Sequence, residues 1–279
     1  MRSKLFVPAA RPDFFAKALA TDADALSFDL EDSVAPEGKV AARERLRAFL
    51  LSDAARATAK TLIVRVNGPD TPFFDEDIAT FAAAGLDLLN LPKCEDAETV
   101  RAAVAAIAAA GNATPRLLIN IETPGALRRA AEIATAHPSV AGLQVGLNDL
   151  FAPLTIERDH AEHVHAALWT IRMAAGEAGC FAYDGAWPKL SDPDGFRAEA
   201  ELARSLGYLG KSCIHPDQVA LANAVFDDRA ASLAEARRII AAAAAAGERG
   251  AFALDGEMID RPAIAQAQAV LATARETGR

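Results

Sequence analysis

Cysteine is scarce in this chain, and its few copies form no motif. Cys94, Cys180 and Cys213 stand far apart among 279 residues. Without a CxxC pair, the spacing argues against a disulfide framework. Each cysteine lies in or beside a strand-like run, so we expect all three to be buried thiols.

An excess of positive charge is also missing. The chain has 29 Lys and Arg against 38 Asp and Glu, which gives a net charge of −9. This balance argues against nucleic acid or an anionic membrane as the main partner. A small anionic ligand remains compatible with it, because a local cluster of arginine and metal can oppose the global charge.

Long apolar runs are absent near the start of the sequence. A basic flank is followed by an apolar run over 5–10 that is short and broken by Pro8. We therefore predict neither a signal peptide nor a membrane span, and we expect a cytoplasmic protein. Hydrophobic residues at 52% and charged residues at 24% are ordinary for a globular enzyme.

Short apolar runs alternate with helical patterns along most of the chain. Strands are expected over 5–9, 25–31, 61–67, 86–92, 116–122, 141–146, 180–184 and 208–214. Helices are expected over 12–20, from about 39, and over 74–84, 97–110, 126–136, 161–178, 196–206 and from 216 onward. Eight such repeats predict an α/β fold, a parallel (β/α)₈ TIM barrel over 1–226. A doubly wound open sheet is the alternative, but its usual Gly-rich phosphate loop after the first strand is missing.

The chain continues beyond what a barrel needs. An Ala-rich helix is expected over 233–246, and a last helix follows Pro262. Residues 227–279 are therefore predicted to be a C-terminal helical extension.

Polar side chains collect where the expected strands end. In TIM barrels the active site lies at the carboxyl ends of the strands. The residues found there are Asp29, Glu31, Asp32, Arg65, Asn67, Lys93, Glu122, Asn148, Asp149, Tyr183, Asp184 and His215. Several acids with an arginine among them favour a site over solvated loops.

Two of these acids suit a metal ion. Glu122 alone would be interpreted as a cap of the helix that starts near Pro124. Asp149, however, follows the adjacent strand, whose backbone lies about 4.8 Å away. Both carboxylates can then reach one hard cation at about 2.0–2.1 Å, which favours Mg²⁺. Asp149 requires a local break in strand alternation after Gly146, which glycine permits.

A zinc site is the less favoured alternative. Zinc prefers histidine and cysteine, whereas the strand ends offer oxygen ligands. His160 and His163 stand outside any strand end and are expected on the exposed start of a helix.

Arg65 shares the inward parity of its strand with Ile63. A buried guanidinium without a partner is costly, so Arg65 is expected to form a fork to a ligand carboxylate or to the acids at 29, 31 and 32. A salt bridge to Glu31 alone is the structural alternative, and the two are compatible. Lys93 could form a Schiff base, but the surrounding acids favour a lysine that stays charged.

The motifs, taken in order, resemble one family over the whole chain. They are Arg2-Ser-Lys-Leu-Phe-Val-Pro8, Arg11-Pro-Asp13, Asp29-Leu-Glu-Asp32 with Lys39, Arg65-Val-Asn-Gly68, Leu91-Pro-Lys93, Ile121-Glu-Thr123, Gly146 with Asp149-Leu150, Gly210-Lys211 with Ile214-His-Pro216, and Gly256-Glu-Met-Ile-Asp260. Together they resemble the citrate lyase beta-subunit-like branch of the HpcH/HpaI aldolase superfamily.

The resemblance implies an Mg²⁺-dependent carbon–carbon lyase. It implies that Glu122 and Asp149 bind the metal, and that Arg65 binds the substrate carboxylate with support from Glu31 and Asp32. In malyl- and citramalyl-CoA lyase relatives, an aspartate matching Asp260 lies on a lid that reaches a neighbouring subunit's site, and the assembly is a trimer or a pair of trimers.

The expected substrate is a 3-hydroxyacyl-CoA, cleaved to acetyl-CoA and glyoxylate or pyruvate. Asp260 would then exchange a proton with the acetyl-CoA enolate. Arg11 and Lys17 belong to a basic N-terminal region that could meet CoA phosphates, although a solvated surface accounts for them equally.

Two other activities stay open. One is an Mg²⁺-dependent pyruvate aldolase without CoA, whose relatives usually lack the C-terminal tail. The other is a citrate lyase beta subunit that acts on an acyl-carrier thioester. The loops after Asp149 and after Tyr183-Asp184 depart from the family pattern. Because both border the expected pocket, they leave the substrate open more than the reaction class.

Overall fold

The computed structural model describes residues 1–82, 86–110, 115–227, 229–247 and 251–276. The chain divides into two compact units, Met1–Val225 and Phe226–Arg279, which are considered separately. Among the described residues, no helix is long and apolar enough to cross a membrane.

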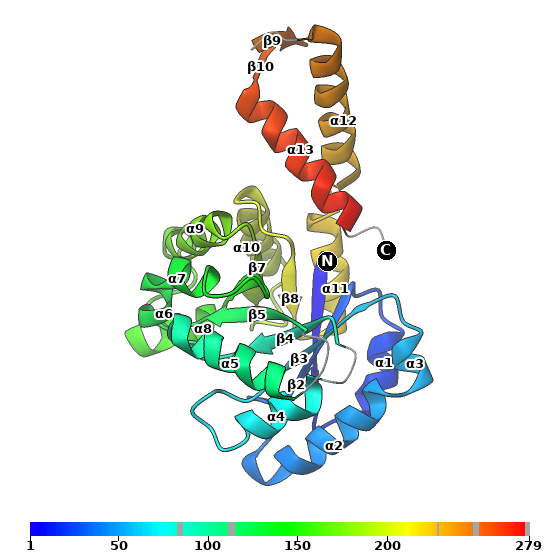
Figure 1. Cartoon of the computed structure of the whole chain (residues 1–279), viewed down its shortest axis with the longest axis vertical. Coiled ribbons are helices and arrows are strands. Elements are labelled where there is room, and N and C mark those ends of the chain that lie inside the picture. Colours follow the sequence, from blue (N-terminus) through cyan, green and yellow to red (C-terminus); the bar gives the residue numbers. More distant parts are fainter. Residues whose placement is uncertain (83–85, 111–114, 228, 248–250, 277–279) are drawn as a thin grey trace. The chain divides into compact units, whose positions relative to one another are not determined.

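The first unit is a closed barrel of eight parallel strands in chain order (Figure 1). The strands are β1 Ser3–Pro8, β2 Ala25–Asp29, β3 Thr61–Arg65, β4 Leu88–Leu91, β5 Arg116–Ile121, β6 Val140–Val145, β7 Phe181–Ala186 and β8 Lys211–Cys213. The barrel closes where β1 pairs with β8, through Lys4 opposite Ser212. The predicted TIM barrel is confirmed.

Helices connect the strands on the outside of the barrel. The main ones are α1 Phe15–Leu19, α2 Lys39–Leu50, α4 Phe74–Phe81, α5 Ala97–Ala109, α9 Ala161–Glu177, α10 Pro193–Ser205 and α11 Pro216–Val225. Asp96 caps α5 by accepting from Thr99 N–H, and Asp192 caps α10 by accepting from Gly195 N–H. The helix expected over 74–84 is α4, which ends at Phe81, and positions 83 and 84 lie outside the described residues.

The helix expected over 126–136 differs from its prediction. It is two short helices, α6 Pro124–Arg128 and α7 Ala130–Ala134, with Arg129 in a non-helical conformation between them. The Arg129 side chain donates to the backbone oxygen of Glu95, 2.7 Å away. The break between α6 and α7 is therefore accompanied by a tertiary contact of Arg129, although the local sequence pattern of the segment favours one continuous helix.

Most strand residues are buried on both faces, as expected for a barrel covered by helices. Cys94 and Cys213 are buried as predicted, but Cys180 is only half-buried because it precedes β7 rather than lying within it. The barrel interior also holds polar side chains, namely Lys4, Ser27, Asn90, Asn120 and Gln144. Asp184 and Lys211 are buried too, but Lys211 Nζ pairs with Asp184 and with Glu199 of the outer helix α10.

The second unit pairs two helices with a β-hairpin. The helices are α12 Arg229–Ala246 and α13 Arg261–Glu276, and between them β9 Ala251–Leu254 pairs antiparallel with β10 Glu257–Asp260. Asp255 and Gly256, with φ of 51° and 88°, form the two-residue turn. The helices match the expected extension, whereas the hairpin is an additional feature.

Candidate active site

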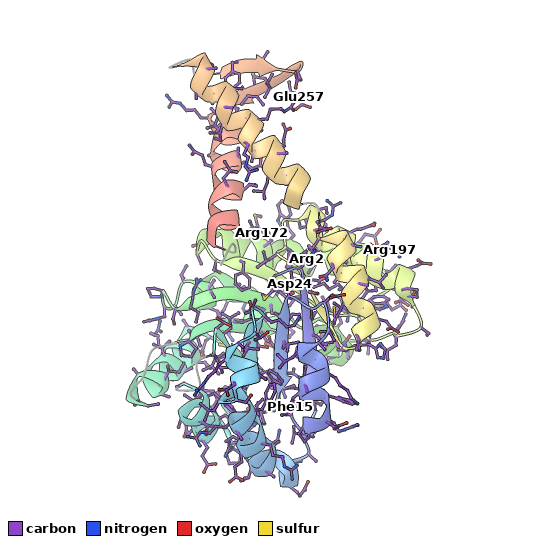
Figure 2. The ribbon with its side chains drawn as sticks, turned by 90° about the vertical axis from the view of Figure 1, so that its right-hand side faces the viewer. Arg2, Phe15, Asp24, Arg172, Arg197 and Glu257 are labelled. Atoms are coloured by element: carbon purple, nitrogen blue, oxygen red, sulfur yellow. The ribbon has the colours of Figure 1, made fainter. Side chains whose placement is uncertain are left out.

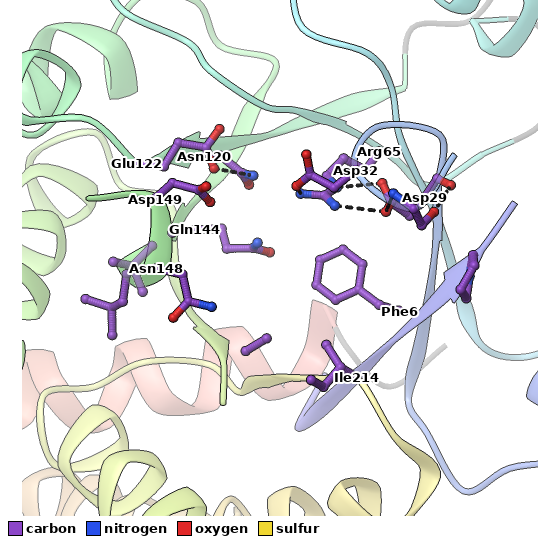
Figure 3. Close-up of a pocket in the computed structure, with 16 residues that line it drawn as sticks. Phe6, Asp29, Asp32, Arg65, Asn120, Glu122, Gln144, Asn148, Asp149 and Ile214 are labelled. Carbon is purple, nitrogen blue, oxygen red and sulfur yellow. Dashed lines mark hydrogen bonds and ion pairs between the residues drawn. The ribbon is translucent and has the colours of Figure 1, made fainter. Parts of the chain in front are cut away.

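A cavity of about 310 Å³ lies at the carboxyl ends of the barrel strands (Figure 3). It is lined by Phe6, Pro8, Asp29, Asp32, Ser33, Arg65, Asn120, Glu122, Gln144, Val145, Gly146, Leu147, Asn148, Asp149, Ala186 and Ile214. Figure 3 shows Glu122 and Asp149 on one side and Arg65 with Asp29 and Asp32 on the other. The cavity thus brings together the predicted metal ligands and the predicted carboxylate-binding arginine.

Glu122 is a buried carboxylate without a cationic partner among the described residues. It directly follows β5 and is 3% exposed. Its Oε1 accepts from Lys93 N–H at 2.5 Å, and its Oε2 accepts from Asn120 Nδ2 at 3.1 Å. Burial raises the pKa of Glu122 to about 7, with a further contribution from the Glu31 and Asp149 carboxylates.

The helix-cap interpretation of Glu122 is wrong. The cap of α6 is Thr123, whose Oγ1 accepts from Ala126 N–H at 3.1 Å. Thr123 can take this role because it directly precedes α6 and has an extended backbone, as N-cap residues do. Glu122 is therefore left to face the cavity.

Asp149 reaches the cavity because β6 ends before it. The strand stops at Val145, and Gly146 begins a one-turn helix, α8 Leu147–Phe151, that carries Asp149. A Cβ on Gly146 would lie 2.5 Å from Glu122 Cβ and 2.8 Å from its Oε2. The predicted break after Gly146 is present, and glycine permits it through this close approach as well.

The donor set fits a hard cation. A buried carboxylate without an ion-pair partner among the described residues lies beside a second, exposed carboxylate, which helps to raise the pKa of the buried one. Among the described residues there is no group of three or more His, Cys, Asp and Glu that could hold a metal. Two carboxylates suit Mg²⁺, which keeps several ligand positions for water and substrate.

The histidines considered for zinc lie elsewhere. His160 Nε2 is 2.9 Å from a carboxylate oxygen of Glu157, and His163 Nδ1 is 2.8 Å from the Glu157 carbonyl oxygen. Both residues are at the start of α9, and neither lines the cavity.

Arg65 is held by three acids. Its Nε and Nη2 donate to the two oxygens of Asp29 at 2.7 and 2.9 Å. Its Nη1 lies 2.8 Å from Glu31 and 3.3 Å from Asp32. Burial alone would lower the pKa of Arg65, but these acids raise it above its usual range. The predicted fork to the acid cluster is confirmed, and a salt bridge to Glu31 alone is too narrow a description.

The guanidinium still has capacity for a ligand. It carries five N–H donors, of which one on Nε and one on Nη2 form the hydrogen bonds to Asp29, while Nη1 forms ion pairs with Glu31 and Asp32. Arg65 also lines the cavity. Its fork to the Asp29 carboxylate fixes the plane of the group, so the donors that remain keep a fixed orientation.

Lys93 stays charged, as expected. Its Nζ lies 2.9 Å from Glu31, and this hydrogen bond raises the pKa of Lys93. Burial of Glu31 outweighs the nearby Arg65 and Lys93 and raises the pKa of that carboxyl. Lys93 also has a φ of 51°, a left-handed conformation that L-residues rarely adopt and that places its N–H on Glu122.

Of the predicted site residues in the first unit, Glu31, Arg11 and Lys17 do not line the cavity. Arg11 is exposed, pairs with Asp13 at 2.9 Å and lies over the Phe14 ring, and Lys17 Nζ is 5.6 Å from the same ring. Asp260 belongs to the second unit, where its Oδ1 accepts from Ala263 N–H at 3.1 Å and caps α13.

Two amides in the cavity, Asn120 on β5 and Gln144 on β6, were not predicted as site residues from the sequence. Asn148, which was among the expected strand-end residues, lies on α8 and also lines the cavity. The inward parity of Asn120 and Gln144 with Glu122 was the available signal. It did not suffice, because a buried amide is equally compatible with internal hydrogen bonding.

The HpcH/HpaI aldolase/citrate lyase model matches residues 2–216. A (3S)-malyl-CoA thioesterase of Cereibacter sphaeroides is 37% identical over 98% of this chain and 94% of its own. An L-malyl-CoA/beta-methylmalyl-CoA lyase of Cereibacter sphaeroides is 35% identical over 97% and 93%. CitE of Mycobacterium tuberculosis, in complex with magnesium, acetoacetate and coenzyme A, has a TM-score of 0.74 and 34% identity over the whole of both chains. This chain therefore belongs to the HpcH/HpaI aldolase/citrate lyase family.

Proposed function

We propose that the protein is an Mg²⁺-dependent carbon–carbon lyase. It cleaves a 3-hydroxyacyl-CoA such as malyl-CoA or citramalyl-CoA into acetyl-CoA and glyoxylate or pyruvate, or it catalyses the reverse condensation. The observation that carries this proposal is Glu122, a buried carboxylate without a counter-charge beside Asp149, in the same cavity as Arg65. The family relationship supports it, because a lyase and a magnesium- and CoA-bound protein are among the similar proteins.

Glu122 and Asp149 would hold the metal ion. When bound, Mg²⁺ supplies Lewis-acid stabilisation of negative charge on an oxygen of the substrate. Lys93 N–H and Asn120 Nδ2 hold the two oxygens of Glu122 in place, which fixes the orientation of the carboxylate before any ligand arrives.

Arg65 binds the substrate carboxylate and orients it. Since three acids already hold the guanidinium, its orientation costs little entropy when the ligand binds. Asp32 lines the cavity and is exposed, whereas Glu31 is buried, so the two acids support Arg65 from opposite environments.

The C-terminal unit acts as a lid in this proposal. Asp260 exchanges a proton with the acetyl-CoA carbon in a neighbouring subunit's site, within a trimer or a dimer of trimers. Arg11 and Lys17 meet the CoA phosphates, and Arg11 must then exchange its contact with Asp13 for the ligand. A cytoplasmic location stays a prediction from the sequence.

Thioester hydrolysis is the second candidate function. The alignment with the thioesterase spans 276 residues, whereas the alignment with the lyase spans 298, which is longer than this 279-residue chain. The lyase thus carries insertions that this chain lacks. In hydrolysis, water attacks the thioester carbonyl and CoA leaves as the thiol, with no carbon–carbon bond broken.

A substrate panel separates the two activities. We would incubate the protein with malyl-, β-methylmalyl-, citramalyl- and citryl-CoA, and with pyruvate aldols, with Mg²⁺ or with EDTA. Acetyl-CoA together with a 2-oxo acid identifies the lyase, and free CoA together with a hydroxy acid identifies the thioesterase. Full activity in EDTA would contradict the metal assignment.

A further inference from the structure

A lysine lies inside the barrel without a carboxylate partner. Lys4 of β1 is fully buried, and no Asp or Glu of the described residues lies within 4.0 Å of its Nζ. The Nζ donates to Oε1 of Gln144 and lies 4.4 Å from the ring centre of Phe6 and 5.6 Å from that of Tyr183. Burial, and then the charge of Arg65, lowers the pKa of Lys4 well below its usual value.

This contact determines which end of the Gln144 amide is available. Lysine supplies N–H donors, so the carbonyl oxygen of Gln144 is the end that faces Lys4. The Nε2 is then the other end, with two N–H donors. Among the described residues, no hydrogen bond from Gln144 Nε2 to a protein acceptor is present, although the residue is only 4% exposed.

Gln144 lies at the centre of the cavity. Figure 3 shows its amide between the Glu122–Asp149 pair and the Arg65 side. The nearby Asn120 amide already has a partner at each end, since its Nδ2 donates to Glu122 Oε2 and its Oδ1 accepts from Asn90 Nδ2. Gln144 is therefore an amide of this cavity with a donor left for a ligand.

We propose that Gln144 is a substrate-binding residue whose Nε2 donates a hydrogen bond to an oxygen of the 2-oxo acid half of the substrate, and that Lys4 is a positioning residue that sets the direction of this donor. The inference rests on the proposed function and deepens it. An oxygen-rich ligand that reaches from the Glu122 and Asp149 carboxylates to Arg65 passes Gln144, which lines the same cavity.

Two variants of Gln144 separate this role from a structural one. Gln144→Glu keeps the size of the side chain and gives Lys4 an ion-pair partner, but it has no N–H donor. Gln144→Leu removes both groups. Calorimetry would measure Mg²⁺ binding first, and then pyruvate and glyoxylate binding to the Mg²⁺-loaded protein.

We expect the Mg²⁺ affinity of both variants to stay within about threefold of wild type. Their affinity for the 2-oxo acids should fall about tenfold or more, because each variant loses one hydrogen bond to a charged ligand. If Gln144→Glu binds the 2-oxo acids like wild type, Gln144 serves only as an acceptor for Lys4, and the inference is overturned. If wild type itself binds neither acid with Mg²⁺ present, the proposed function fails instead.

Lys4 is tested through its coupling to Gln144. Lys4→Met keeps an unbranched side chain of similar length but has no hydrogen-bond donor. If this variant does not fold, Lys4→Arg, which keeps a donor, takes its place. We expect Lys4→Met to weaken 2-oxo acid binding severalfold in the wild-type background and to have no further effect in Gln144→Leu. Losses that simply add in the double variant, or wild-type binding in Lys4→Met, would overturn the positioning role.

Discussion

Gly146 packs directly against Glu122, so that a single added methyl group would overlap the side chain of this proposed metal ligand. The Cβ of an alanine would lie 2.5 Å from Glu122 Cβ, a separation that real Cβ atoms do not show. The end of β6 and the end of β5 thus depend on each other. One small residue allows the close approach of the two chain segments that carry the proposed metal ligands, Glu122 and Asp149.

Gly146→Ala should weaken Mg²⁺ binding without altering either ligand. The methyl group must displace Glu122, and we expect the affinity to fall about tenfold or more, as for other changes that misorient a ligand. Titration calorimetry measures the affinity, and thermal unfolding checks the fold. Gly38→Ala is the matched control, because its Cβ would have ordinary contact with Val34 at 3.5 Å. Unchanged Mg²⁺ binding in Gly146→Ala would contradict the packing argument.

Mg²⁺ affinity should rise with pH around neutrality. Without metal the pKa of Glu122 is about 7, so below that pH the carboxyl holds a proton that the metal must displace. We expect the dissociation constant to fall from pH 6 to pH 8 and proton release to accompany binding at pH 6. Calorimetry in two buffers of different ionisation enthalpy measures the released proton. A pH-independent affinity would argue that Glu122 is already ionised.

The same shift makes the metal-free protein less stable as pH rises. The pKa of Glu122 is raised in the fold, so its contribution is fully present below about 4.5 and is lost as pH rises to about 7. The loss is about 3 kcal/mol of unfolding free energy over this window. Chemical unfolding in EDTA should show it in wild type and not in Glu122→Gln, whose side chain cannot ionise. Equal slopes for the two proteins would contradict this assignment.

Much of this site could be predicted from the sequence, because strand ends in a parallel barrel share one rim. Glu122, Asp149 and Arg65 each follow an apolar run, and eight repeats make those runs neighbours. The contact of Lys4 with Gln144 could not be predicted in this way. It joins β1 to β6 across the interior of the barrel. It depends on how far along the barrel axis each side chain lies, and not only on whether the side chain points inward.

Arg65→Lys should lower kcat/KM by about 100-fold while the charge stays. Lysine is a point charge and cannot form the two parallel bonds to Asp29 or present a fixed donor to a ligand. Steady-state kinetics on the productive thioester measures the loss, with Mg²⁺ affinity as a readout that should not change. Arg128→Lys is a matched control on the outside of the barrel. Wild-type kinetics in Arg65→Lys would mean that the charge alone is sufficient.

Arg158 should support the segment that carries Asp149. It donates to Asn148 Oδ1 at 2.5 Å, to Ala186 O at 2.7 Å and to both oxygens of Glu199, which in turn pairs with the buried Lys211. Arg158→Met removes the link between α8 and this buried network. We expect unfolding free energy to fall by about 3 kcal/mol, since Glu199 loses a buried partner, and Mg²⁺ affinity to fall severalfold.

The control for Arg158 is Asn148→Ala, which removes only the contact to α8. We expect it to reproduce the loss of Mg²⁺ affinity with a much smaller loss of stability. Thermal unfolding and calorimetry on both variants separate the two effects. If Asn148→Ala leaves Mg²⁺ affinity unchanged while Arg158→Met lowers it, the effect does not travel through Asn148.

Asp260 should be required for turnover but not for folding. Asparagine keeps the oxygen that accepts from Ala263 N–H and caps α13, so Asp260→Asn should unfold like wild type. It cannot exchange a proton, and we expect kcat to fall about 100-fold or more. Mixing Asp260→Asn with Glu122→Gln should restore part of the activity after subunit exchange, because one subunit then supplies Glu122 and its neighbour supplies Asp260. Exchange verified by mass spectrometry without any recovery would place both residues in the same chain's site.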